Sequence, residues 1–497
     1  MTKEHDVIVV GKGNAALCAA LAARENGVNV VMFEAAPEEE SGGNSRYAGG
    51  LMRAVYESVE DLKRVMELTE EEVANTDFGT NTKEEYFDDL FRVTNYRTDP
   101  NLSETLVTNS FDTLVWLRSK GVRFLPVYWR QSGMVNGRRV FFGRLPFEVS
   151  GAGAGLVQFL DAAAAKAGIK VFYETRATDL IYDGERVQGV RARQKGKAVE
   201  FRAKSVILAC GGFEANAEMR SRYLGLDWDV VKVRGTRFNM GAGIKMALDI
   251  GAAPYGNWTG CHATCWDRYA PEFGDVDVGN QFQKHAYIFG LMINADGKRF
   301  VDEGFEFHAF TYAKYGKDVL KQPGQFAWQI FDSKITDDML PTEYRTKFLT
   351  KATANTLEEL APKLDGVNPE TFLKTVQEYH AAVRRDVPFQ QTVKDGKCTV
   401  GITPPKSNWA QLLDTPPFHA YAVTCGITFT FGGLRIDSKT GEVLDIDFHK
   451  IPGLYCAGEM VGGVFYGNYP SGTGLVSGAV FGRIAGASAA AAAKSKG

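Results

Sequence analysis

Cysteine is sparse in this sequence of 497 residues, and its seven residues are scattered along the chain. None forms a C-x-x-C or C-x-x-C-H pattern, so iron–sulfur clusters, structural zinc and c-type haem are not predicted. Cys261 and Cys265 flank His262, but further metal ligands are missing nearby. Such low use of cysteine is typical of a reduced, cytoplasmic protein.

The sequence also lacks a dominant sign of charge and a long apolar run. Its 57 basic and 60 acidic residues give a formal net charge of −3, which argues against nucleic acid or an anionic membrane as the main partner. No apolar run approaches the length of a membrane span. The first apolar strand begins within a few residues of Met1, which leaves no room for a signal peptide. We therefore expect a cytoplasmic protein, long enough for two domains.

The stretch from Asp6 to Ala16 combines an apolar strand, a sharp turn and the start of an alanine-rich helix. Gly11 permits the turn, Gly13 lets a pyrophosphate approach the backbone, and Ala16 allows helix and strand to pack closely. The N–H groups at the helix start then face the phosphates. A second apolar strand ends in Glu34, whose carboxylate suits a ribose 2′-hydroxyl. The pattern predicts binding of a dinucleotide that contains ADP.

Further glycine-rich tips occur at both ends of the chain: Ser41–Gly50, the strand that ends at Gly211 and Gly212, Gly453–Glu459 and Gly462–Gly478. For these tips to converge on one ligand, the first and last parts of the chain must share a domain. We predict an α/β fold in which residues 1–250 and 429–497 form the dinucleotide-binding domain and residues 251–428 form an inserted capping domain. Pockets form preferentially at such junctions.

Between these tips, the pattern predicts helices around Asp61–Val73, Glu84–Val93 and Leu102–Ser119, and a last helix over Val480–Ala492. The aromatic, arginine-rich segment from Phe124 to Phe147 leaves two interpretations open. It is either a β-hairpin near a pocket or a solvated flap.

Several motifs together resemble the flavoprotein subunit family of fumarate reductase and succinate dehydrogenase. They are the glycine fingerprint, Gly42–Ser45, Leu208–Phe213, Gly297–Glu303, Tyr455–Glu459 and Phe481–Gly486. Within that family, the group of FAD-dependent tricarballylate dehydrogenases is most similar, through Arg234–Asn239, Gln322–Gln325, Asp414–Phe418 and Gly426–Thr430. The resemblance implies a discontinuous Rossmann-type FAD-binding domain with an inserted α+β capping domain. It also implies hydride transfer between flavin N5 and a carbon next to an electron-withdrawing carbonyl.

The resemblance also implies which residues bind FAD. Glu34 is expected at the adenosine ribose and Glu459 at a FAD hydroxyl, while Gly474 and Leu475 would offer N–H groups to the pyrimidine edge of the flavin. The loop Gly42–Ser45 lacks the histidine that binds flavin covalently in succinate dehydrogenases, so FAD should be non-covalent. The complete set is Gly11, Gly13, Asn14, Ala15, Ala16, Glu34, Ala35, Gly43, Asn44, Ser45, Gly49, Gly50, Ala177, Cys210, Gly211, Gly458, Glu459, Gly474 and Leu475.

The sequence departs from the family at the substrate. The acid-catalyst arginine of fumarate reductases falls at Phe307, beside His308. Their clamping histidine and clamping arginine fall at Phe429 and Tyr469, whereas one histidine of the cap is matched by His262. These exchanges remove donors that a small dicarboxylate needs, so fumarate and succinate are not expected. Tyr469 instead resembles a tyrosine of ketosteroid dehydrogenases that polarises a ketone.

The predicted reaction is α,β-dehydrogenation of a carboxylic acid such as tricarballylate, or the reverse ene reduction. It needs a group that moves a proton and a donor that stabilises enolate charge. Two alternatives stay open, a ketosteroid-like or aromatic enone dehydrogenase and a non-catalytic FAD electron-transfer protein. The catalytic candidates are His262, Tyr469 and His308, with His285 and Tyr287 as further ones; the substrate-binding candidates are Arg234, Arg237, Arg268 and Phe429.

The sequence contains no second dinucleotide fingerprint. Direct reduction of the flavin by NAD(P)H is therefore not predicted, and an external electron partner is expected. The resemblance implies that this partner is a membrane-bound iron–sulfur protein.

Overall fold

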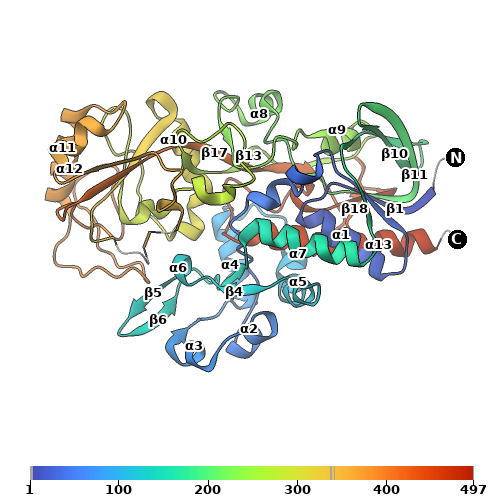
Figure 1. The fold of residues 1–497 in the computed structure, drawn as a ribbon, viewed down its shortest axis with the longest axis horizontal. Helices are drawn as coiled ribbons and strands as arrows, with labels where there is room; N and C mark the ends of the chain where they lie inside the picture. The colour runs from blue at the N-terminus through green and yellow to red at the C-terminus, as the bar shows by residue number, and fades with distance from the viewer. Residues whose placement is uncertain (1–3, 336–338, 341, 496–497) are drawn as a thin grey trace.

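The first and last parts of the chain build one sheet (Figure 1). The computed structural model describes residues 4–335, 339–340 and 342–495. In it the strands lie in the order β18-β19-β11-β1-β2-β8, and β10 joins β9 to β11. β1 is parallel to both β11 and β2, so three carboxyl ends meet at one edge. The bounds are β1 Glu4–Val10, β2 Val30–Phe33, β8 Lys170–Phe172, β9 Thr175–Tyr182, β10 Val187–Gln194, β11 Lys197–Leu208, β18 Glu442–Leu444 and β19 Lys450–Cys456.

Two helices from opposite ends of the chain, α1 (Asn14–Glu25) and α13 (Thr473–Lys494), pack against each other. A Cβ at Gly482 would lie 2.5 Å from the carbonyl oxygen of Ala15, so glycine is what allows this approach. α13 is long and apolar enough to cross a membrane, with mean hydropathy 1.4. This finding qualifies the expectation from the sequence that no apolar run approaches the length of a membrane span. However, 61% of that stretch is buried inside the protein, where its apolar side chains complete the core.

α13 begins seven residues earlier than predicted, at Thr473 rather than Val480. Gly472 precedes it with a φ of 81°, the left-handed conformation that favours glycine. The glycines that follow suggested a loop, but they lie in the first turns of the helix. The predicted donors Gly474 and Leu475 therefore belong to a helix N-terminus, where backbone N–H groups lack partners within the helix.

The middle of the chain builds a second sheet, in which β17 (Phe418–Leu434) pairs with β12, β13, β15 and β16. β17 is antiparallel to β13 over most of its length, from the cofactor side at Leu434 to the cap at Val423. β12, at Lys232–Val233, joins this sheet although it lies ahead of residue 251. The other elements are β13 Pro254–Asp267, β14 Leu291–Ile293, β15 Phe326–Phe331, β16 Lys351–Ala354, α8 Ala217–Leu224, α9 Ala242–Leu248, α10 Tyr312–Leu320, α11 Leu357–Leu360 and α12 Pro369–Ala382.

A helical lobe covers the cofactor domain on the side seen at the bottom of Figure 1. The helix predicted over Asp61–Val73 is in fact two, α2 (Val59–Val65) and α3 (Glu70–Asn75). The break has a local cause, because Thr69 and Glu72 form a capping box that starts a new helix. The remaining elements are α4 Lys83–Val93, α5 Pro100–Ser119, α7 Ala152–Lys166, β3 Thr76–Asp77, β4 Phe124–Pro126 and β7 Phe147–Val149.

The aromatic, arginine-rich segment from Phe124 to Phe147 contains a β-hairpin, which agrees with the first of the two interpretations of its sequence. α6 (Tyr128–Gln131) leads into β5 (Ser132–Val135) and β6 (Arg138–Phe141), which pair antiparallel. We call residues 128–142 the flap. At its end, Phe142 stacks on Phe307 of the cap, with ring centroids 5.1 Å apart. The flap therefore joins the helical lobe to the cap.

Candidate functional site

A first cavity of about 890 Å³ lies at the carboxyl ends of β1, β2 and β11, and we call it the nucleotide cavity. Gly11 turns the chain away from β1 with a φ of 112°, and a Cβ there would lie 2.3 Å from the carbonyl oxygen of Ala209. The N-cap residue of α1 is Gly13, which has no side chain, and the N–H of Asn14 donates to Oγ of Ser45 at 3.0 Å, so the next N–H groups of the first turn are left to a ligand. This donor set suits a diphosphate.

Glu34 lines the same cavity at the tip of β2 and is only 7% exposed. Its Oε1 accepts a hydrogen bond from the N–H of Ala36 at 2.8 Å. Burial raises the pKa of this carboxyl above its ordinary value, against the effect of that hydrogen bond and of Lys12. A buried acceptor at a strand tip fits a ribose hydroxyl, which would donate to it.

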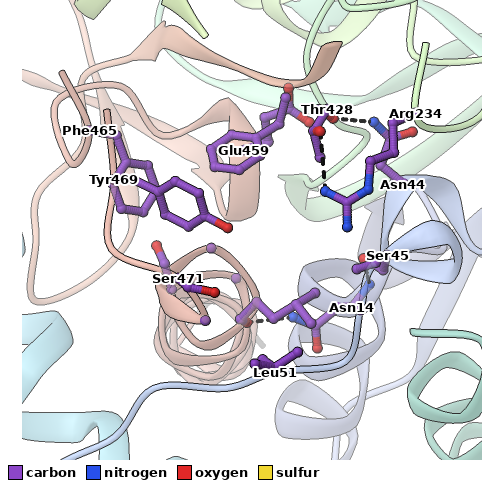
Figure 2. A pocket seen from close by; sticks show the side chains of 18 of the residues that line it. Asn14, Asn44, Ser45, Leu51, Arg234, Thr428, Glu459, Phe465, Tyr469 and Ser471 are labelled. Atoms are coloured by element: carbon purple, nitrogen blue, oxygen red, sulfur yellow. Dashed lines mark hydrogen bonds between the residues drawn. The ribbon is translucent and has the colours of Figure 1, made fainter. Parts of the chain in front are cut away.

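A second cavity of about 1160 Å³ continues from the first, and we call it the substrate pocket (Figure 2). Both cavities are lined by Asn14, Asn44, Ser45, Gly458 and Glu459. Every residue predicted to bind the cofactor lines one of the two, except Ala16. Ala16 is fully buried beneath them, as expected for a packing residue. The two cavities thus form one elongated site that fits a dinucleotide with a flat second ring system.

Asn44 and two carboxyl groups lie where the cavities meet. The amide of Asn44 donates to Glu214 and to the carbonyl of Thr428, and it accepts from the N–H of Thr236. Glu214 is fully buried, and one of its oxygens has no partner. Glu459 accepts from the N–H of Thr430 at 2.7 Å. Burial and then the neighbouring Glu459 raise the pKa of Glu214 well above its ordinary value, so this pair retains a proton.

We expect the pair to make stability fall as pH rises. A carboxyl whose pKa is raised on folding stabilises the protein below its unfolded pKa, and this contribution is lost as pH rises through the folded pKa. Glu214→Gln imitates the protonated form, because its oxygen can still accept from Asn44 and its amide can donate to Glu459. Thermal denaturation of the holoprotein between pH 5 and pH 9 should show a flatter pH dependence for this variant.

Glu218→Gln is the matched control for that measurement. Glu218 lies on α8 with its side chain 62% exposed and paired with Arg222, so its replacement should leave the pH dependence unchanged. A Glu214→Gln protein that follows the wild-type curve would contradict the shared proton.

Aromatic side chains form one wall of the substrate pocket. The hydroxyl groups of Tyr312 and Tyr469 contact each other, and both residues line the pocket with Phe429 and Phe465. In Figure 2 the hydroxyl of Tyr469 points into the pocket. Burial raises the pKa of Tyr469 well above its ordinary value, with Tyr312 adding to the effect. Tyr469 therefore stays protonated and can donate to a carbonyl or enolate oxygen.

His262 lies behind this wall. Its ring stacks on Phe429 with centroids 5.3 Å apart and an angle of 8°, and it does not line the pocket. The residue is fully buried, and burial lowers the pKa of the imidazole well below its ordinary value. His262, a catalytic candidate from the sequence, is thus neutral and shielded from the pocket.

A second part of the pocket lining is polar and adjoins the aromatic wall, since the rings of His285 and Tyr312 have centroids 6.4 Å apart. It contains Gln131, Gln283, His285 and His308, from the flap and the cap. The Nε2 atoms of Gln131 and His308 lie 3.0 Å apart, and the rings of His285 and His308 have centroids 4.9 Å apart. His308 and His285 thus reach the pocket as the sequence suggested. Tyr287 does not line it; its hydroxyl bonds to Thr311 inside the cap.

Of the three predicted arginines, Arg234 alone lines the substrate pocket. Its Nε donates to Oδ1 of Asn280 at 2.9 Å, and Figure 2 shows its guanidinium pointing into the pocket. Arg237 pairs with Glu40 at 2.7 Å, and Arg268 pairs with Asp365 at 3.3 Å. These two lie outside the pocket, so we assign neither to the substrate.

Four residues of the site were not named as candidates from the sequence, although Gln131 lies in the segment Phe124–Phe147, for which a place near a pocket was one interpretation. They are Gln131, Gln283, Tyr312 and Glu214. None belongs to a spacing motif, and each reaches the site only because the chain folds distant segments together. Tyr312 is the first residue of the amphipathic helix α10, and this position could have been noticed in the sequence.

Comparisons with known proteins agree with this site. A family model described as FAD binding domain matches residues 6–476. A probable fumarate reductase Ifc3 of Shewanella frigidimarina (strain NCIMB 400) is 31% identical over 97% of this chain and 74% of its own length. An NADH:fumarate oxidoreductase of Klebsiella pneumoniae (strain 342) is 27% identical over 98% of this chain, which spans only 48% of that relative. The solved open conformation of a flavocytochrome c3 fumarate reductase matches with a TM-score of 0.72 and 28% identity, over 99% of this chain and 79% of that one.

Proposed function

Because the chain belongs to the FAD binding domain family, we propose that this FAD-dependent oxidoreductase acts on the α,β carbon–carbon bond of a carboxylic acid such as tricarballylate. FAD, when bound, supplies the acceptor or donor of the hydride. The protein then has to bind the acid, orient it, exclude water and move one proton at the α-carbon.

The observation that carries this proposal is the charge distribution of the substrate pocket. Arg234 points into a pocket whose opposite side presents the hydroxyl of Tyr469 (Figure 2). The guanidinium would bind the carboxylate through charge-assisted hydrogen bonds. Tyr469 would donate to the oxygen on which enolate charge develops. His308, on the polar wall, would exchange the proton with the α-carbon.

Anaerobic mixing of the holoenzyme with candidate substrates tests the proposal. Tricarballylate should bleach the absorbance of oxidised flavin, or the corresponding unsaturated acid should reoxidise reduced flavin. Succinate serves as the matched acid that lacks the third carboxylate, and little bleaching is expected from it. Absence of any reaction with activated carboxylic acids would refute the proposal.

A second candidate substrate class is an enone or a ketone, and the aromatic wall favours it. Phe429, Phe431, Phe465 and Tyr469 together present a broad apolar face to the pocket. Such a face suits a steroid-like or aromatic ring, whose carbonyl Tyr469 would polarise. Bleaching by a saturated ketone, but by none of the acids, would establish this alternative.

Arg234→Met is expected to raise KM for the acid substrate by about 10²-fold or more, because loss of one partner of a buried charge pair costs about 2–5 kcal/mol. The arginine is 5% exposed, so water does not replace it. Arg237→Met is the matched control, since that residue lies three positions on and pairs with Glu40 outside the pocket. Steady-state kinetics on both variants measures the effect, and equal KM values would refute the assignment of Arg234.

An external protein would exchange electrons with the flavin. This proposal rests on the lack of a second dinucleotide fingerprint in the sequence and on the family resemblance. An iron–sulfur protein at a membrane is the partner that the resemblance favours, with this chain in the cytoplasm. A reduced one-electron dye that supports turnover where NADH does not would support it.

A further inference from the structure

The flap brings one polar side chain into the substrate pocket. Gln131 ends the single turn of α6 and is 1% exposed. The backbone N–H of Phe142 donates to the backbone carbonyl of Gln131 at 2.8 Å, and the ring of Phe142 stacks on Phe307 of the cap. The backbone at Gln131 is therefore held against the cap, which brings its side chain to His308, 177 positions away in sequence.

The amide of Gln131 meets His308 at Nε2, 3.0 Å away. An amide can present either N–H or oxygen to that nitrogen by turning about its last bond, whereas a carboxylate offers oxygen only. The amide oxygen of Gln131 is buried without a hydrogen-bond partner. Gly143 makes room for this oxygen, because a Cβ there would lie 2.7 Å from it. The second orientation of the amide would pair that oxygen with a protonated Nε2.

We propose that Gln131 is a positioning residue that sets the tautomer of His308 through the orientation of its amide. This inference rests on the proposed role of His308 in proton transfer. With N–H presented, Gln131 holds Nε2 unprotonated, and the ring proton is on Nδ1. With oxygen presented, it holds Nε2–H in both the neutral ring and the imidazolium, which leaves a lone pair on Nδ1 of the neutral ring. Nδ1 is then the atom that exchanges the proton with the substrate, and no charge is added beside the ring.

Other charged and titratable groups lie around His308. His285 faces its ring from the cap, and Tyr312 lies beyond it, at 6.4 Å from His285. Glu306, two residues before His308, pairs with Arg92 and Lys394. On the lobe side, Arg53 and Arg144 both pair with Asp89. Tyr469 and Arg234 complete the set across the pocket.

Substitutions of Gln131 in the holoenzyme test the inference. Gln131→Glu places a carboxylate at Nε2, which stabilises the imidazolium. The apparent pKa that His308 contributes to the pH profile of kcat/KM should therefore rise by ~1 pH unit. Gln131→Leu removes both orientations and should lower kcat by about 10- to 100-fold, with KM and FAD affinity nearly unchanged. Gln391→Leu is the matched control, because Gln391 packs against the flap at Gly133 and is not bonded to His308.

A second readout does not depend on the substrate. The protein has seven histidines, so NMR of ¹⁵N-histidine with a His308→Asn reference identifies the resonance of His308. Its titration should move to higher pH in Gln131→Glu and stay unchanged in Gln391→Leu.

If Gln131→Glu leaves both the titration and the pH profile as in wild type, Gln131 does not set the state of His308. A shifted titration without turnover of any acid would instead refute the proposed function and leave the inference standing. FAD content and melting temperature of each variant separate misfolding from these outcomes.

Discussion

His308→Asn is expected to lower kcat for α,β-dehydrogenation by about 10²- to 10⁴-fold, the usual contribution of a positioned acid or base. His308 lines the substrate pocket, whereas His262 lies behind Phe429. The asparagine keeps a polar group of similar reach, and the residue has no contact with the nucleotide cavity. FAD binding should therefore persist. Rapid anaerobic mixing with tricarballylate, followed at the flavin absorbance, measures the rate of the chemical step directly.

Two histidine variants provide controls for that result. His380→Asn affects a half-buried residue on α12 whose Nε2 accepts from the N–H of Leu413, so it should leave the rate unchanged. His262→Phe keeps a ring against Phe429 and should change the rate by only a few-fold. If His308→Asn behaves like His380→Asn while His262→Phe loses activity, the proton is moved by the candidate His262 and not by His308.

Gly11→Val is expected to abolish FAD binding altogether. The new Cβ would lie 2.3 Å from the carbonyl oxygen of Ala209, and a φ of 112° is strained for valine. The turn can relieve this clash only by moving away from β11, which displaces the N-terminus of α1 from the phosphates. The protein should purify without bound flavin. Fluorescence quenching of added FAD, measured on the purified variant, should show no saturable binding.

Gly168→Ala separates this effect from backbone strain alone. Gly168 also has a positive φ, 71°, but nothing lies within 4 Å of its added Cβ. We expect a cost of about 1 kcal/mol in stability with full occupancy by FAD. If Gly11→Val retains FAD as well as Gly168→Ala does, the turn at Gly11 is not the phosphate cradle.

The cofactor half of the site could be predicted because local physics determines it. A strand, a turn that needs glycine and a helix start follow one another within residues 6–16, so their spacing is visible in the chain itself. The same holds for Glu34 at the tip of β2. The joining of both chain ends in one sheet followed from the requirement that all glycine tips meet one ligand, and β19 does pair with β11.

The substrate half could not be predicted in the same way, because contacts between distant segments determine it. Gln131 and His308 meet through the packing of the flap on the cap. His262 and Phe429 share a register on β13 and β17, and the sequence does not tell which ring faces the pocket. Arg237 and Arg268 have the right chemistry but are paired with surface carboxylates. Which charges find partners is decided only in the folded molecule.

The strand β17 belongs to both halves of the protein. Its first residues pair with β15 and β16 deep in the cap, while Thr430 near its other end donates to Glu459 at the cofactor site. Its pairing with β13 thus runs from the cap to the cofactor side, with register shifts between Asn257 and Cys261 and between His262 and Ala263. Slow amide hydrogen exchange should extend along β17 on both sides of these shifts, and the cap and the FAD domain then open as one cooperative unit. Loss of flavin would in that case loosen the far end of the cap as well.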